Sequence, residues 1–167
     1  MKNIVLIGMP GSGKSTLGVI LAKTLGVDFV DTDIVIQNRT GELLYKTLER
    51  VGVSGLLDEE ENAILSLDPS QRASVISTGG SAVLREKSMA HLKKDGTCVY
   101  LALPYETIEK RVGAYATRGI AAENGESLLN IYNYRLPFYQ KYADLTIDCA
   151  DKSIETIIAE ILRQLIQ

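Results

Sequence analysis

Short apolar runs alternate along the chain with longer stretches in which apolar residues recur every three or four positions. The short runs are typical of strands buried in a parallel sheet, and the longer stretches are typical of helices that cover such a sheet. This alternation predicts an α/β fold. The strands are predicted at 3–7, 28–32, 74–78, 97–103 and 144–149. The helices are predicted at 14–25, 34–38, 42–51, 56–67, 86–94, 105–112, 127–142 and 153–166.

Two stretches interrupt the simple alternation of strand and helix. Residues 34–70 form a helical insert between the second and third predicted strands. Residues 113–126 are mostly small and polar, which predicts a long loop. Long irregular loops in compact domains often close over an active site, so we expect this segment to act as a lid.

A glycine-rich motif joins the first predicted strand to the helix after it. Residues 8–15 read GMPGSGKS, a complete G-x-x-x-x-G-K-S phosphate-binding loop. Its backbone N–H groups are expected to point at phosphate oxygens, at the positive end of the helix. Lys14 is expected to reach the β- and γ-phosphates, and Ser15 to offer its hydroxyl to Mg²⁺. The flanking strand and helix distinguish the motif from a chance glycine-rich turn, so the chain is predicted to bind a nucleoside triphosphate.

The position of the acidic residues separates a kinase from other proteins with this loop. Motor-type ATPases usually carry an acid at the end of a core strand, but Pro104 follows the strand predicted at 97–103. The Asn-Lys-x-Asp motif of GTPase switches is absent from the sequence. Instead, Asp31 and Asp33 end the second predicted strand. If the strand continues, both carboxylates share one face beside the phosphate loop, where one can serve Mg²⁺ and the other a substrate hydroxyl. The alternative is a solvated turn.

Composition narrows the functional classes further. The 167 residues suffice for one domain with a substantial core. A net charge of −3 with scattered signs argues against a nucleic-acid partner. The N-terminal apolar stretch is too short for a signal peptide and no run approaches the length of a membrane span, so we expect a cytoplasmic monomer without membrane contact. Cys98 and Cys149 lie in apolar runs and are expected to be buried free thiols.

Further motifs match a known family. They are Asp31-Thr32-Asp33, Arg39-Thr40-Gly41, Ser77-Thr78-Gly79-Gly80, Arg118 and Arg135-x-Pro137-x-Tyr139. With these motifs and the phosphate loop, the chain resembles the shikimate kinases, nucleoside-monophosphate-kinase-like P-loop proteins, along essentially its full length. The resemblance implies a three-layer α/β/α P-loop NTPase fold with a five-stranded parallel sheet. It also implies one kinase domain over 1–167, with a substrate-binding insert at 34–70 and a lid at 113–126.

The resemblance implies catalytic and metal-binding roles for three side chains besides Lys14 and Ser15. Asp33 would hold and activate the accepting hydroxyl. Asp31 would support Mg²⁺ through water, next to Ser15. Arg118 would fold over the transferring phosphate, although a solvated loop charge is the alternative for this residue.

The resemblance also implies binding residues for ATP and for a small hydroxylated substrate. Arg111 matches an arginine that stacks on adenine, and Arg135 matches one of the arginines that grip the substrate's carboxylate. For both residues the alternative is an ordinary position on a helix surface. The predicted nucleotide-binding set is Gly8, Met9, Pro10, Gly11, Ser12, Gly13, Lys14, Ser15, Thr16 and Arg111, and the predicted substrate-binding set is Asp33, Gly79, Gly80 and Arg135.

The acceptor side departs from the family pattern. Shikimate kinases carry Gly-Glu and then Phe-Arg in the insert, and that arginine also binds the substrate's carboxylate. Here the arginine position falls on Leu57, Val53 replaces the glutamate, and Ser81 replaces the third glycine. Loss of such an arginine contact in a desolvated pocket weakens binding by about 2–5 kcal/mol if nothing replaces it. The acidic run at 58–61 would add to this loss if it faced the pocket, and we favour the alternative that it forms the wet side of a helix.

The predicted function is therefore ATP-dependent transfer of the γ-phosphate to a small-molecule hydroxyl, with shikimate as the expected acceptor and shikimate 3-phosphate as the product. A kinase of the same architecture for another hydroxyl compound remains an alternative. A nucleotide-binding regulatory protein that transfers little phosphate is a third hypothesis. Asp33 and Arg118 argue against it, because a pure binder would not need them.

Overall fold

A computed structural model describes residues 2–68, 72–113, 120 and 126–166. Its strands form a five-stranded sheet in which neighbours pair in parallel in the order β2-β3-β1-β4-β5. This arrangement confirms the predicted fold class. The strands are β1 (Asn3–Ile7), β2 (Asp28–Asp31), β3 (Ser74–Ser77), β4 (Gly96–Ala102) and β5 (Leu145–Asp148).

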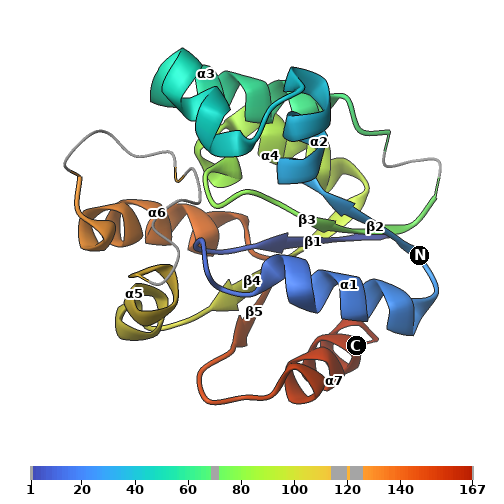
Figure 1. The fold of residues 1–167 in the computed structure, drawn as a ribbon. Helices are drawn as coiled ribbons and strands as arrows, with labels where there is room; N and C mark the ends of the chain where they lie inside the picture. Colours follow the sequence, from blue (N-terminus) through green and yellow to red (C-terminus); the bar gives the residue numbers. More distant parts are fainter. Residues whose placement is uncertain (1, 69–71, 114–119, 121–125, 167) are drawn as a thin grey trace.

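Helices cover both faces of the sheet and produce three layers. Figure 1 shows α1 and α7, which contact each other, on one face, and α4 with α3 packed against it on the other. The helices are α1 (Lys14–Leu25), α2 (Thr32–Thr40), α3 (Leu44–Leu65), the 3₁₀ helix η1 (Ala82–Leu84), α4 (Glu86–Lys94), α5 (Tyr105–Gly113), α6 (Leu128–Tyr142) and α7 (Ile154–Leu165). No helix in the described ranges is long and apolar enough to cross a membrane.

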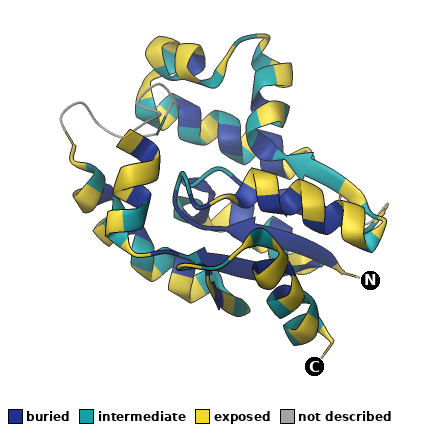
Figure 2. Cartoon of the chain, turned by 60° about the horizontal axis from the view of Figure 1, so that its bottom comes forward, coloured by how far each residue is buried: buried dark blue, intermediate teal, exposed yellow. Residues whose placement is uncertain are grey.

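The core lies between these layers, and β1 is its centre. Every residue of β1 is buried, which fits its place between β3 and β4 under helices on both faces (Figure 2). Parallel strands that are covered on two sides need apolar residues at successive positions, and this requirement explains the uninterrupted run that the sequence shows here. Cys98 and Cys149 are buried free cysteines, as predicted.

The insert between β2 and β3 consists of two helices that pack on each other. The helices predicted at 42–51 and 56–67 are joined in α3, which bends at Gly52. Gly52 has φ 71° and ψ −177°, a conformation that glycine adopts more easily than other residues. The two predicted helices therefore correspond to the two arms of one kinked helix.

Candidate active site

The phosphate loop runs from the buried end of β1 into the first turn of α1. Gly13 precedes the helix with φ 91°, and Gly11 has φ 81°, so a side chain at either position would strain the backbone. Because Gly13 has no side chain with which to cap α1, the N–H groups of the first turn are available to an anion. The local sequence thus builds an anion site from backbone groups alone.

Lys14 lies within this loop and is 7% exposed. Its Nζ atom donates to the carbonyl oxygens of Gly8, at 2.8 Å, and Met9, at 2.9 Å. Burial lowers the pKa of Lys14 to about 8, against the opposing effect of Asp33 and Asp31. A bound triphosphate would supply the negative charge that this buried ammonium group lacks.

Asp31 and Asp33 do lie together, but the predicted reason for this is wrong. The strand does not continue through both residues, because β2 ends at Asp31 and α2 begins at Thr32. Asp31 caps α2, and its Oδ1 atom accepts the backbone N–H of Asp33 at 3.0 Å. Its other oxygen, Oδ2, accepts the hydroxyl of Ser15 at 2.6 Å. Helix capping therefore brings Asp31 to Ser15 and turns Asp33 in a different direction.

Asp33 faces the loop that follows β3. The hydroxyl oxygen of Thr32 accepts the N–H of Gly79 at 3.0 Å, which fixes the start of α2 against this loop. A Cβ atom on Gly79 would lie 3.1 Å from Oδ1 of Asp33, so only glycine leaves the carboxyl its place. Burial and the charge of Asp31 raise the pKa of Asp33 to about 6, and Lys14 opposes this shift. Such a carboxyl is a competent acceptor for a hydroxyl proton near neutral pH.

Glu60 is a pocket residue that the sequence analysis missed. It is 3% exposed and lines the same cavity, so the expected water-exposed position of the 58–61 run is wrong for this residue. Asp58 does face water, where it pairs with Arg85 at 2.6 Å. Burial raises the pKa of Glu60 to about 7, while a hydrogen bond from Ser81 lowers it. The signal was present in the sequence, because Leu56 and Glu60 are four positions apart and share a helix face.

Arg135 enters the cavity from α6 and is 2% exposed, so the surface alternative is wrong. A Cβ atom on Gly80 would lie 3.2 Å from Nη1 of Arg135, which shows how closely the guanidinium approaches this loop. Tyr139, one turn further along α6, donates its hydroxyl to the carbonyl of Gly80 at 2.6 Å. Its ring stacks on that of Tyr100, with centroids 5.2 Å apart. The hydrogen bond to Gly80 holds α6 against the loop at Gly79 and Gly80, which we call the glycine loop.

The two remaining predicted arginines differ in what the structure says of them. Arg111 is exposed, lines the cavity, and donates from Nη1 to the carbonyl of Gly11 at 3.2 Å, so it lies at the phosphate loop. Arg118 and most of the predicted lid at 113–126 lie outside the described residues. Ile120, which is described, lines the cavity.

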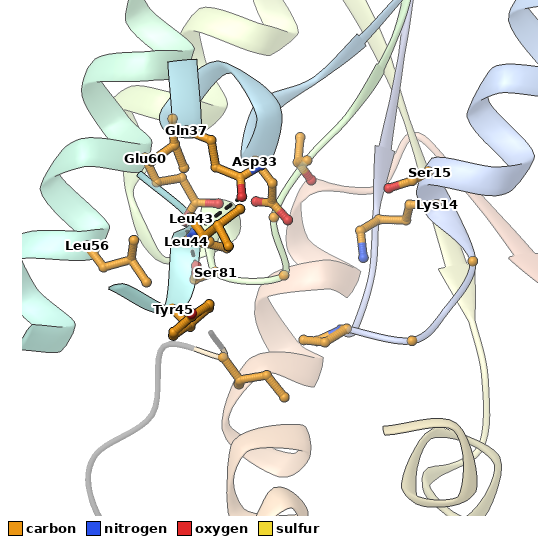
Figure 3. A pocket seen from close by; sticks show the side chains of 18 of the residues that line it. Lys14, Ser15, Asp33, Gln37, Leu43, Leu44, Tyr45, Leu56, Glu60 and Ser81 are labelled. Carbon is orange, nitrogen blue, oxygen red and sulfur yellow. Dashed lines mark hydrogen bonds between the residues drawn. The ribbon is translucent and has the colours of Figure 1, made fainter. Parts of the chain in front are cut away.

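One cavity of about 660 Å³ joins these groups. Figure 3 shows Lys14 and Ser15 on one side of it and Asp33 and Glu60 on the other. Its outer wall is apolar and is formed by Ile36, Leu43, Leu44, Tyr45, Leu56 and Ile120. On the part of α3 that follows the bend at Gly52, the residues that line the cavity are Leu56 and Glu60. Leu57, at the family's arginine position, is not among the lining residues.

Comparison with known proteins decides the family. The family model described as shikimate kinase matches residues 10–166. The chain belongs to the shikimate kinase family. A shikimate kinase from Thermodesulfovibrio yellowstonii is 39% identical over 98% of this chain and 95% of its own length. The structure of shikimate kinase from Acinetobacter baumannii in complex with shikimate matches with a TM-score of 0.91 at 30% identity, over 99% of this chain and 93% of that one.

A second group of relatives has another architecture. The human protein threonine synthase-like 1 is 37% identical over 89% of this chain, but the match covers only 20% of that protein's length. The two shikimate kinases, in contrast, match from end to end. Family membership confirms the predicted activity of an ATP-dependent kinase with a small-molecule hydroxyl acceptor, and it supports shikimate, the family's substrate, as that acceptor.

Proposed function

We propose that shikimate is the acceptor and that the cavity transfers the γ-phosphate of ATP to one of its hydroxyl groups. The observation that carries the proposal is the order of three groups along one cavity. Lys14 lies at the phosphate loop, Asp33 lies at Gly79, and Arg135 lies at Gly80. The cavity therefore offers an ammonium group for phosphates, a carboxyl that can take a proton, and a guanidinium that can bind a carboxylate. This set suits a substrate that carries both a hydroxyl and a carboxylate group.

In the proposed reaction, Asp33 accepts the hydrogen bond of the attacking hydroxyl. The hydroxyl oxygen forms a bond to the γ-phosphorus of ATP, and the bond from that phosphorus to the bridging oxygen of ADP breaks. The hydroxyl proton passes to Asp33. Lys14 balances the charge on the phosphates, and because its burial leaves it poorly solvated, this interaction is strong.

Mg²⁺ is part of this proposal. The hydroxyl of Ser15 and the carboxyl of Asp31 present hard oxygen atoms, which are 2.6 Å apart, next to the phosphate loop. Oxygen donors of this kind suit Mg²⁺, which also keeps water and phosphate ligands. Ser15 would bind the ion directly and Asp31 would hold one of its waters. When bound, the ion neutralises charge on the β- and γ-phosphates.

The other predicted site residues complete the proposal. The backbone of the loop from Gly8 to Thr16 holds the phosphates. Arg111, which bonds to the carbonyl of Gly11, stacks on the adenine base. The insert at 34–70 forms the acceptor side through Leu56 and Glu60. We assign to Arg118, within the lid at 113–126, the role of the cation that folds over the transferring phosphate. We also propose that the kinase is a single domain that acts as a monomer.

An ADP-release assay with shikimate, quinate-like acids, sugars, amino alcohols and nucleosides tests the choice of acceptor. We expect shikimate to give the highest kcat/KM, with stoichiometric shikimate phosphate by mass spectrometry. A much higher kcat/KM for an uncharged polyol would mean that the apolar wall and the single arginine select a different acceptor. ADP release that no acceptor stimulates would instead favour the regulatory reading.

A further inference from the structure

The side chain of Ser81 forms its hydrogen bond outside its own helix. It occupies the N-cap position of η1, where a serine side chain commonly accepts an N–H group of its own helix. Its side chain makes no such bond. Instead, its Oγ atom donates to Oε2 of Glu60, 21 positions earlier in the chain, at 2.5 Å. The hydroxyl therefore ties the loop after β3 to α3, on the acceptor side of the cavity.

This bond determines where the carboxyl of Glu60 lies. Its second oxygen, Oε1, is placed against Gly79, where a Cβ atom would collide with it. The next residue, Gly80, is the one approached by Nη1 of Arg135. The carboxyl group and the guanidinium thus lie beside consecutive residues of one loop. Asp33 and Lys14 are the other charged groups that act on Glu60.

A buried carboxylate beside the same loop as a guanidinium competes for it. Arginine and carboxylate groups form strong paired hydrogen bonds, and a carboxylate on the acceptor would need that same guanidinium surface. A hydroxyl that holds Glu60 on the Gly79 side reduces the competition without removing the carboxyl. Two cations act on Glu60, and Arg135 acts on it more strongly than Lys14 does, so without the hydroxyl we expect the carboxyl to turn toward Arg135.

We propose that Ser81 is a positioning residue for acceptor recognition: its hydroxyl holds Glu60 against Gly79 and keeps that carboxyl from competing with the acceptor's carboxylate for Arg135. The inference rests on the proposed function, since it requires an acceptor that carries a carboxylate. It gives Ser81, a departure from the family's glycine, a role that compensates in part for the missing cation at Leu57.

The first test compares Ser81→Ala with two controls. Ser81→Thr keeps the hydroxyl. Ser88→Ala removes a hydroxyl that is also buried, lies on α4, and has no hydrogen-bond partner among the described residues. We expect Ser81→Ala to raise the KM for shikimate about tenfold, with kcat and the KM for ATP unchanged. Ser81→Thr and Ser88→Ala should stay close to the original protein. An unchanged KM in Ser81→Ala would overturn the proposal.

The second test separates positioning from a general loosening of the loop. Methyl shikimate lacks the carboxylate with which Glu60 would compete for Arg135, so its KM should be the same in Ser81→Ala and in the original protein. An equal rise in KM for the acid and for the ester would show that Ser81 is merely structural.

A third measurement uses Glu60→Gln, first alone and then combined with Ser81→Ala. Glu60→Gln alone, in which Ser81 is kept, should not raise the KM for shikimate, and this result does not depend on how well Ser81→Ala folds. With the competing charge removed, adding Ser81→Ala to Glu60→Gln should not raise the KM for shikimate further. A tenfold rise in that background would contradict the proposal. Turnover of shikimate by the original protein is measured first, so a wrong acceptor is recognised before any variant is interpreted.

Discussion

The phosphate loop and the acceptor pocket share one cavity but are built in different ways. The loop is one continuous segment, and Lys14 is held by carbonyl groups only five and six positions away. The acceptor side takes Asp33 from α2, Glu60 from α3 and Arg135 from α6, on either side of a glycine loop. One half depends on local backbone geometry, whereas the other depends on where separate helices pack.

The two halves also differ in how their charges are balanced. The ammonium group of Lys14 is balanced by a bound triphosphate, which is the general role of the lysine in this loop motif. On the acceptor side, Asp33 and Glu60 both have raised pKa values because burial disfavours their charged forms. We infer that the nucleotide half tolerates little variation, while the acceptor half can be adjusted by single substitutions that redistribute charge. The following experiments test that contrast, from the largest expected effect to the smallest.

Lys14→Ala should cause the largest loss. The substitution removes the cation at the β- and γ-phosphates, and we expect kcat/KM for ATP to fall by about 10³-fold or more. The fold should persist, because removal of a buried charge leaves the apolar core intact. Steady-state kinetics and thermal unfolding measure the two effects. Lys23→Ala, at an exposed position near the end of the same helix, is the matched control. Normal turnover in Lys14→Ala would end the claim that this loop is the catalytic phosphate site.

Asp33→Asn should lower kcat more than it weakens ATP binding. An amide cannot take the hydroxyl proton, and loss of a positioned base reduces the rate by about 10²-fold or more. ATP affinity, measured by titration calorimetry, should change little because Asp33 faces the acceptor loop. Asp28→Asn on β2, where the carboxylate is exposed and pairs with Arg72 at 3.3 Å, should have no comparable effect. An unchanged kcat in Asp33→Asn would make Asp33 a structural residue.

The pH dependence of kcat/KM for the acceptor should report Asp33. Its pKa of about 6 lies above the ordinary value, and the ionised form is the one that accepts a proton. Activity is therefore present above pH 6 and lost as the pH falls, by about tenfold at pH 5. Glu60 titrates nearby, with a pKa of about 7, so the profile is also measured in Glu60→Gln, which should keep an acidic limb. A limb near pH 4 would contradict the assignment.

Leu57→Arg should produce a smaller change, and in the opposite direction. Position 57 lies three residues before Glu60 on α3, so an introduced guanidinium can reach that carboxyl and the end of the pocket. We expect the KM for shikimate to fall about three- to tenfold with kcat unchanged. Leu57→Lys adds the charge without the bidentate geometry and should do less. A higher KM would indicate that the apolar wall, rather than a missing cation, determines acceptor binding.

Sequence reasoning was most accurate where structure is local. The helices predicted at 14–25 and 86–94 match α1 and α4 residue for residue. The phosphate loop was placed correctly because its glycines permit backbone angles that other residues avoid, and these angles need no distant partner. The parallel sheet followed from apolar runs of strand length, because burial on both faces favours apolar residues at successive positions, as at 4–7 in β1.

The acceptor side was less predictable. Asp31 and Asp33 were predicted to share one face of a continuing strand, but β2 ends at Asp31, which caps α2. Two acids at this spacing suit the end of a strand and the start of a helix alike. The exposure of the acidic run at 58–61 was misjudged at Glu60 because the run was treated as one unit, although Glu60 shares a helix face with Leu56. Burial of Arg135 was an open question because a helix sequence alone does not reveal which side another element will cover.

The sequence by itself determined the order of strands and helices, the anion site at the start of α1, and the kinase class through its acids and glycines. These features rest on periodicity and on backbone angles that neighbouring residues impose. Only the tertiary structure decided that Glu60 faces the cavity, that Ser81 holds it, and that Arg135 lies beside Gly80. Those contacts join residues that lie 21 positions apart, for Ser81 and Glu60, and 55 positions apart, for Gly80 and Arg135. Their energies depend on desolvation, which exists only once the helices have closed over the sheet.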